Sequence, residues 1–212
     1  MNIFIENLIT RYPVLQKCQV DIEKACQVCC DSFSNGGSLF LCGNGGSASD
    51  ADHISGELMK GFLLKREISE DKKAELAALF GDEGKFIADH LQDGLPAVSL
   101  NGHPALSSAF ANDVDPSMVF AQQLYVMGKP GDVVIGLSTS GNSDNILKCF
   151  KVAKYKGITS ILLTGRDGGK GAQIADLSLI MPEMETYKIQ ELHLPVYHTM
   201  CIVIEDYFYG KK

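Results

Sequence analysis

The amino-acid sequence predicts an α/β protein built as a three-layer, doubly wound parallel sheet. Short apolar segments typical of buried strands alternate with segments whose apolar residues recur at helical spacing. Two glycine- and serine-rich turns also follow directly after two of the apolar segments, where a strand would pass into a helix. Ligands of such folds bind beyond the carboxyl ends of the strands. We therefore expect both turns to lie at the ligand-binding edge.

The elements are predicted in a regular order along the chain. The expected strands are the apolar segments 38–42, 96–100, 133–138, 159–164 and 177–182. The expected helices after the first strand are 47–60, 104–127, 143–156, 169–175 and 186–209. A further helix is expected over 14–34 and is stopped by Asn35, Gly36 and Gly37. The chain is then a single domain, 1–212, with N-terminal helices in 1–35, an α/β core in 38–182 and a C-terminal helix.

The charged segment 62–94 does not fit this alternation and is predicted to be a helical insertion. Ser69, followed by Glu70 and Asp71, is typical of a helix start, and Gly81 predicts a break before a second short helix. The sequence leaves open whether this hairpin is only a surface feature or serves as a lid or a subunit contact.

Composition excludes several classes of protein. The net charge of −7 over 212 residues argues against a nucleic-acid-binding surface, which is basic. No apolar stretch is long and uncharged enough to span a membrane. The seven cysteines lie in mostly apolar segments, and the chain begins without the basic start of a secretory leader. We expect reduced, buried thiols in a cytoplasmic protein.

The two turns are predicted to bind an anionic, polar ligand. The first runs from Cys42 to Ser49 as Cys-Gly-Asn-Gly-Gly-Ser-Ala-Ser, and the second from Ser138 to Ser143 as Ser-Thr-Ser-Gly-Asn-Ser. Glycine lets the backbone approach a ligand, helix N-termini attract anions, and hydroxyls add uncharged donors. The alternative is that both turns merely cap helices. Capping needs one hydroxyl, so the cluster of four in the second turn favours a phosphate.

Candidate groups for acid–base chemistry lie in two helices. His53 and Glu57 are four residues apart, so they share one face of the helix that follows the first turn. In the last helix, Gln190 and His198 would lie about 12 Å apart along a regular helix axis, so converging on one atom would stretch both side chains. An interior Pro195 would ease this by kinking the helix or by marking its start.

His193 is the rival to His198, since it lies nearer to Gln190 in the sequence. Both histidines fall in a strongly apolar run, where a buried polar group needs a partner. The family resemblance described next favours His198.

Several motifs together resemble the sugar isomerase (SIS) domain family. They are Cys-Gly-Asn-Gly-Gly-Ser with a following His-x-x-x-Glu, then Ser-Thr-Ser-Gly-Asn-Ser, Leu-Thr-Gly-Arg-Asp-Gly-Gly and Ile-Gln-Glu-Leu-His. Within that family the chain is similar to the phosphoheptose (sedoheptulose 7-phosphate) isomerases. The resemblance covers nearly the whole chain except 62–94, and this insertion puts the exact sugar in doubt.

The resemblance implies a role for each matching residue. Those implied to bind the sugar are Asn44, Gly45, Gly46, Ser47, Asn112, Asp113 and Gln190. Those implied to bind the phosphate are Ser138, Thr139, Ser140 and Ser143. Those implied to hold zinc are His53, Glu57, Gln190 and His198. Glutamine is a weak zinc ligand, so partial occupancy is expected.

The resemblance also implies that Glu57 and His198 transfer protons. An aldose and a ketose interconvert through an enediol(ate), which requires a base that reaches two neighbouring carbons and an acid at the carbonyl oxygen. The expected reaction converts sedoheptulose 7-phosphate to D-glycero-D-manno-heptose 7-phosphate. The alternatives are a non-catalytic sugar-phosphate-binding regulator or adaptor, and an isomerase of the same fold with another phosphosugar.

The active form is expected to be a homo-oligomer, a tetramer, with sites completed across subunits. The last helix is apolar on several faces, which suits burial between subunits. Burial of that helix within one subunit is the alternative. SIS relatives also commonly pair their domains.

Overall fold

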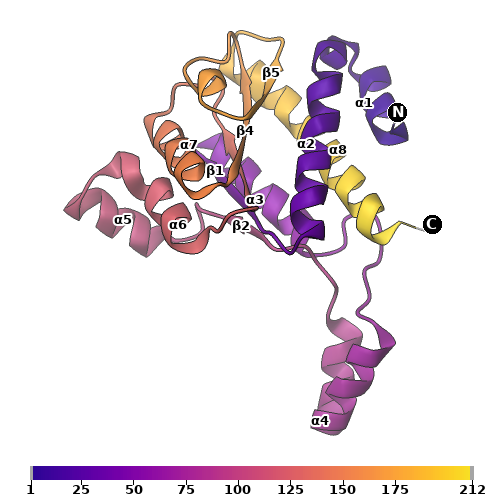
Figure 1. Ribbon diagram of the computed structural model, residues 1–212. Coiled ribbons are helices and arrows are strands. Elements are labelled where there is room, and N and C mark those ends of the chain that lie inside the picture. The colour runs from indigo at the N-terminus through magenta and orange to yellow at the C-terminus, as the bar shows by residue number, and fades with distance from the viewer. Residues whose placement is uncertain (1, 211–212) are drawn as a thin grey trace.

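The computed structural model describes residues 2–210, so residues 1, 211 and 212 of the predicted domain lie outside the described part. Its centre is a parallel five-stranded sheet with the strand order β2-β1-β3-β4-β5 (Figure 1). The strands are β1 (Leu39–Gly43), β2 (Ala97–Ser99), β3 (Val133–Leu137), β4 (Thr159–Gly165) and β5 (Leu177–Met181). All five predicted strands are confirmed, and the doubly wound parallel fold with them.

Helices cover both faces of this sheet. One face carries α1 (Ile3–Arg11), α2 (Gln19–Ser34), α3 (Gly46–Met59) and α8 (Thr186–Tyr209). The other carries α6 (Val119–Met127) and α7 (Asp144–Lys156), with α5 (Pro104–Asp113) beside α6 (Figure 1). Because side chains alternate across a strand, Leu39 and Leu41 face the first layer whereas Phe40 and Cys42 face the second.

Three predicted helices differ from the observed elements. The segment 104–127 is divided into α5, a 3₁₀ turn at Pro116–Met118 and α6, because Asp115 caps Ser117 and Pro116 begins a new helical turn. The segment 169–175 forms only a 3₁₀ turn, Gly171–Gln173. Residues 14–34 form a 3₁₀ turn, Pro13–Cys18, followed by α2.

The insertion is a helical hairpin, as predicted. Ser69 caps its first helix by accepting a hydrogen bond from the Lys72 N–H. The helix assigned as α4 (Glu70–His90) breaks at Gly81, which has φ 60° and ψ −132°. A Cβ on Gly84 would stand 1.9 Å from the Leu76 carbonyl oxygen, so the two arms pack through this glycine.

The hairpin projects away from the sheet (Figure 1). It leaves after the last turn of α3 and returns just before β2 begins. It therefore starts from the amino edge of the sheet, opposite the edge where the strands end. The hairpin does not cover the two turns of its own subunit.

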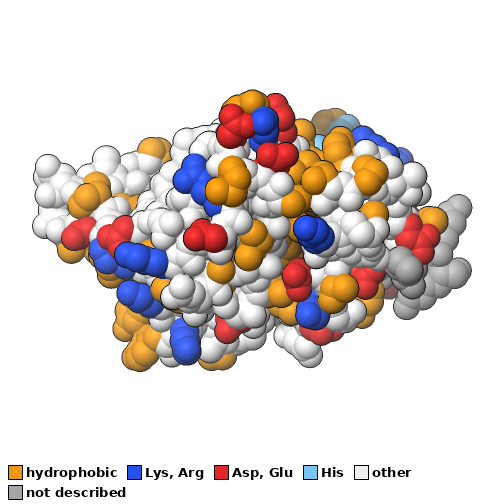
Figure 2. Space-filling model, turned by 90° about the horizontal axis from the view of Figure 1, so that it is seen from above, with side chains coloured by type: hydrophobic (Ala, Val, Ile, Leu, Met, Phe, Trp, Pro, Cys, Tyr) orange, Lys and Arg blue, Asp and Glu red, His pale blue; other side chains and the backbone are white. Residues whose placement is uncertain are grey.

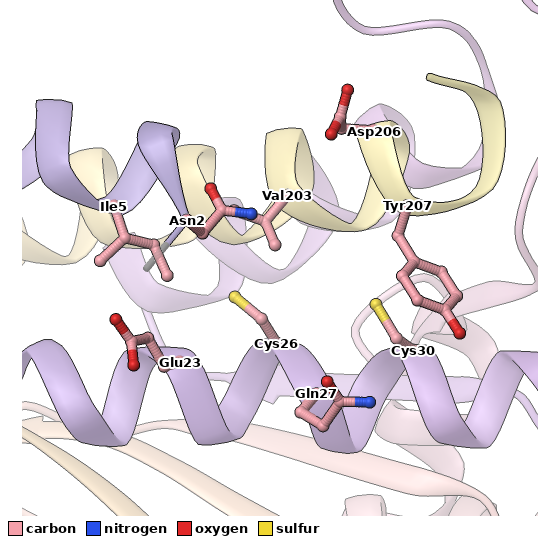
Figure 3. A pocket seen from close by; sticks show the side chains of 9 residues that line it. All are labelled: Asn2, Ile5, Glu23, Cys26, Gln27, Cys30, Val203, Asp206 and Tyr207. Atoms are coloured by element: carbon pink, nitrogen blue, oxygen red, sulfur yellow. The ribbon is translucent and has the colours of Figure 1, made fainter. Parts of the chain in front are cut away.

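The seven cysteines are free and buried, as the sequence predicts. Cys26 and Cys30 line a cavity of about 290 Å³ between α1, α2 and α8 (Figure 3). Burial is the main cause that raises the pKa of the Cys26 thiol, and it raises that of Cys30 to about 12. These thiols are therefore protonated at neutral pH.

Between residues 2 and 210, no helix has the length and apolar character needed to cross a membrane.

The apolar face of α8 is used mostly inside the subunit. Val196, Met200 and Ile204 are buried in the core, whereas Leu194 remains 41% exposed. Burial within one subunit therefore accounts for most of the pattern that suggested a subunit contact. The helix also runs through Pro195, nine residues after its first residue, so this proline does not mark a helix start.

Candidate functional site

The second turn joins β3 to α7 at the carboxyl edge of the sheet. The Ser138 and Ser143 hydroxyl oxygens lie 2.9 Å apart, and Ser140 Oγ accepts a hydrogen bond from the Asn142 N–H. Ser143 occupies the N-cap position of α7 but makes no side-chain capping bond. The hydroxyls of this turn are thus not used for capping, which favours the ligand-binding interpretation.

A glycine-rich loop after β4 supports this turn from behind. Gly141 has φ 64°, and a Cβ there would lie 1.9 Å from the Gly168 carbonyl oxygen. Gly171 N–H donates to the Gly141 carbonyl at 2.8 Å, and Lys170 N–H donates to the Asn142 side chain at 3.1 Å. This loop carries the Leu-Thr-Gly-Arg-Asp-Gly-Gly motif of the family resemblance. Its support of the second turn was not predicted, although its paired glycines were the available signal.

The first turn joins β1 to α3 beside the second. Gly45 is the N-cap of α3, with φ 57°, and no side chain caps this helix. The amides of Asn44 and Asn145 exchange two hydrogen bonds, of 3.0 and 2.9 Å, and so link the first turn to the start of α7. A Cβ on Gly46 would lie 2.8 Å from Gln190 Nε2. Gln190 therefore lies against the N-terminal end of α3.

These turns and Gln190 form what we call the edge group, which consists of Asn44, Gly45, Gly46, Ser47, Ser138, Thr139, Ser140, Ser143 and Gln190. The face at the carboxyl ends of the strands carries acidic and basic side chains scattered among each other (Figure 2). No lysine or arginine lies inside either turn. An anion bound here would be held by backbone N–H groups and hydroxyls.

A second set of side chains, which we call the helix group, lies further along α3 and α8 and comprises His53, Glu57, Tyr197 and His198. His53 Nε2 lies 3.1 Å from Glu57 Oε1, and His53 Nδ1 lies 3.1 Å from the Tyr197 hydroxyl. The rings of His53 and His198 have centroids 5.0 Å apart. The structure thus brings together three of the four side chains that the family resemblance implies for zinc.

Charge in the helix group is only partly neutralised. Lys60 Nζ lies 3.1 Å from Glu57 Oε2, and the Glu57 side chain is 14% exposed. Tyr197 donates to Asp50, whose carboxyl has a pKa raised mainly by burial. Burial and the nearby His53 lower the pKa of His198, and its buried Nε2 has no hydrogen-bond partner among the described residues. The imidazole of His198 is therefore neutral and has an unused ring nitrogen. Sequence reasoning missed Tyr197 and Asp50, although Asp50 lies one helical turn before His53.

His193 faces the sheet instead. It is fully buried, and its Nε2 lies 3.3 Å from the Thr164 carbonyl oxygen. Burial lowers its pKa to about 4. The structure thus places His198, and not His193, beside His53.

The helices α3 and α8 pack in parallel and in register. Gly46 lies opposite Gln190, and His53, seven residues later, lies opposite Tyr197, seven residues after Gln190. Since a helix rises about 1.5 Å per residue, Glu57 lies about 16 Å along α3 from Gly46. Gln190 therefore belongs to the edge group, away from His198. In one subunit the two groups lie at opposite ends of α3.

Asn112 and Asp113 join neither group within the subunit. They are the last two residues of α5, both are exposed, and the Asn112 side chain donates to Asp113 at 2.8 Å. The helix α5 lies on the far side of the sheet from α8 (Figure 1).

Two family models match this chain, both described as the SIS domain, over residues 5–82 and 107–205. A phosphoheptose isomerase of Aliarcobacter butzleri is 34% identical over 203 residues, covering 96% of this chain and 94% of that protein. One of Helicobacter pylori is 36% identical over 198 residues, covering 93% and 90%. The chain belongs to the phosphoheptose isomerase family of SIS-domain proteins.

Solved structures of this family share the fold. The phosphoheptose isomerase of Neisseria gonorrhoeae has a TM-score of 0.67 and 30% identity, covering 95% of this chain and 98% of that one. That of Francisella tularensis has a TM-score of 0.72 and 25% identity, with coverages of 97% and 100%. The edge group and the helix group thus lie in an isomerase fold.

Proposed function

We propose that this isomerase converts sedoheptulose 7-phosphate to D-glycero-D-manno-heptose 7-phosphate. Its curated relatives carry the name phosphoheptose isomerase. The observation that carries the proposal is the helix group, in which the Glu57 carboxylate contacts His53, and His53 packs against His198. A non-catalytic regulator or adaptor of the same fold would need neither a base nor an acid there.

The edge group supplies the binding half of the site. The hydroxyls of Ser138, Thr139, Ser140 and Ser143, with the N–H groups at the start of α7, bind the phosphate. The first turn (Asn44 to Ser47), Gln190 and the pair Asn112–Asp113 bind the sugar hydroxyls. This division is the one that the family resemblance implies. The groups suit it, since hydroxyls and N–H groups donate to phosphate oxygens, and side-chain amides both donate to and accept from sugar hydroxyls.

The helix group supplies the proton transfers. Glu57 takes the proton from the carbon beside the carbonyl and returns it to the neighbouring carbon, with an enediol(ate) between the two steps. His198 exchanges a proton with the substrate oxygens as the carbonyl changes place. His53 holds the carboxylate of Glu57 from one side and Lys60 holds it from the other, at 3.1 Å each.

Zinc is proposed as the metal of this site, with partial occupancy. Two imidazoles and a carboxylate are suitable zinc ligands, and the unpartnered Nε2 of His198 is an available donor. Among the described residues no three His, Cys, Asp or Glu side chains are arranged as a ready metal site. His53, Glu57 and His198 of one subunit would hold the ion, with Gln190 supplied from the edge group of a neighbouring subunit, and the ion would polarise the substrate carbonyl.

We also propose that residues 1–212 form one domain and that the active protein is a homotetramer in the cytoplasm. The reason for proposing assembly is the distance between the edge group and the helix group of one subunit, which is about 16 Å along α3. A neighbouring subunit can bring its own helix group to the edge group, and it can bring Asn112 and Asp113 as well. Seven free thiols suit a reducing compartment.

The deciding experiment measures turnover of a panel of five- to seven-carbon sugar phosphates by monitoring the conversion between aldose and ketose. Preference for sedoheptulose 7-phosphate supports the proposal, and conversion of another sugar would reassign the substrate within the isomerases. If exchange of carbon-bound hydrogen with heavy water is absent for every sugar that binds, the protein is a binding module. Sedimentation of the same sample gives the assembly state.

A further inference from the structure

Arg66 is a charged residue that is nearly fully buried, at 2% exposed. It lies in the stem of the insertion, yet its side chain has no exposed surface. Its Nε donates to Glu205 Oε1 at 2.8 Å. Its other nitrogens donate to the backbone carbonyls of Leu58 at 2.7 Å and Glu57 at 3.3 Å. Arg66 therefore binds the last turn of α3, whose carbonyls have no partner within the helix.

Glu205 anchors the other side of this network. Its side chain is 1% exposed, and its carboxylate accepts hydrogen bonds from the N–H groups of Phe62, Leu63 and Leu64 at 2.8, 2.8 and 3.1 Å. Burial alone would raise the pKa of Glu205, but the N–H groups of Phe62 and Leu63, together with Arg66, outweigh burial and lower it. Glu205 lies two helical turns after His198 on α8, so the network joins α3 to α8.

The residues held by this network are those that surround the helix group. Arg66 binds the carbonyl of Glu57 itself. Glu205 fixes Phe62, whose ring lies 5.6 Å from that of His198. The network therefore joins the backbone of the proposed base to the helix of the proposed acid.

We infer that Arg66 and Glu205 are positioning residues that set the placement of Glu57 relative to His198. The inference rests on the proposed function, because it needs Glu57 and His198 to act on one substrate. Burying an ion pair contributes little net stability compared with an apolar pair of the same volume. Its use here is the geometry that its several hydrogen bonds impose on two helices.

The test separates positioning from folding by replacing the ion pair with an apolar pair. The variants are Arg66→Met, Glu205→Leu and the double variant, each measured for kcat, KM and melting temperature. Either single variant leaves a buried charge without its partner and should lose stability. The double variant should recover most of the melting temperature, while kcat stays about 10²-fold low because small displacements of reacting groups have effects of that size. KM should be nearly unchanged, since the edge group is remote.

The matched control is Asp132→Asn. Asp132 is also a buried carboxylate that accepts N–H groups, from Ser38 and Lys129, but it contacts neither α3 nor α8. Its kcat should stay at the wild-type value below its melting temperature. Wild-type kcat in the double variant would overturn the inference, and so would a loss that appears only in KM.

Two further measurements keep the test decisive. If the double variant does not fold, Glu205→Gln, which keeps an acceptor oxygen, replaces it and should show the same selective loss of kcat. Amide hydrogen exchange should rise at Leu58 and Met59 in the variants, and unchanged exchange there would overturn the inference without any use of turnover. Absence of turnover in the wild type would instead contradict the proposed function.

Discussion

The two ends of α3 differ in chemistry although they belong to one helix. The N-terminal end presents glycines, an asparagine and N–H groups without side-chain caps, next to a turn of hydroxyls. The C-terminal end presents a histidine and a glutamate, and below them the buried pair of Arg66 and Glu205. An end built from backbone and neutral donors suits binding of an anion, and an end built from titratable groups suits proton transfer. Anion binding and proton transfer are therefore expected at opposite ends of one helix.

The largest expected effect is at the chemical end. Glu57→Gln keeps the shape of the side chain and loses its basicity, so kcat should fall by roughly 10²–10⁴-fold, the range of general base catalysis, while substrate binding persists. Exchange of substrate carbon-bound hydrogen with heavy water gives an independent measurement. The control is Glu67→Gln, at an exposed carboxylate that only pairs with lysines. Exchange at the wild-type rate in Glu57→Gln would remove this residue from the base role.

A smaller and different effect is expected at the binding end. Replacing Ser138 and Ser140 by alanine removes two hydroxyl donors to a charged group, so KM should rise about 10²-fold with little change in kcat. Ser108→Ala, at an exposed hydroxyl on α5 that bonds its own helix, is the control. Unchanged affinity for a sugar phosphate in the double variant would show that this turn does not bind the phosphate.

Mixing subunits that are defective at opposite ends of α3 tests whether the edge group of one subunit meets the helix group of another. If each site takes one group from each of two subunits, then Glu57→Gln mixed equally with the Ser138/Ser140 variant should recover about a quarter of wild-type activity by random pairing. The mixture is dissociated and reassembled before the assay, and each variant treated alone is the control. No recovery in verified mixed oligomers would mean that each subunit builds its site alone.

The smallest expected effect concerns stability at low pH. Burial holds the pKa of His193 at about 4, against about 6.5 in an unfolded chain. Between these two pH values the unfolded chain binds a proton at His193 that the folded chain does not bind. The free energy of unfolding should therefore have its full value above pH 6.5. It should fall by about 3 kcal/mol as the pH drops to 4. Denaturant unfolding across this range measures it.

His193→Gln should flatten that pH dependence, since the amide keeps a hydrogen-bond donor and does not titrate. His90→Gln, at an exposed histidine of the hairpin, should leave the slope as in the wild type. An equal slope in wild type and His193→Gln would place the acid sensitivity elsewhere.

Much of the fold could be predicted because its signals are local. The strands were found from apolar runs and the hairpin from Ser69 and Gly81, since capping and glycine conformation depend on neighbouring residues. The split of 104–127 was missed because apolar spacing continues across Asp115 and Pro116. The burial of Arg66 could not be predicted, because a charged residue within a charged segment is normally expected to be exposed to solvent.

The sequence alone was enough to predict the succession of strands along the chain, the position of both turns at the ends of strands, and the residue types available for binding and proton transfer. The parallel, in-register packing of α3 and α8, which puts Gln190 beside Gly46 and His198 beside His53, could be seen only in the folded chain. The same holds for the contact of Arg66 with Glu205 across 139 residues. The reason is physical: periodicity records which face of an element is buried, whereas the partner of that face depends on packing between segments far apart in the chain.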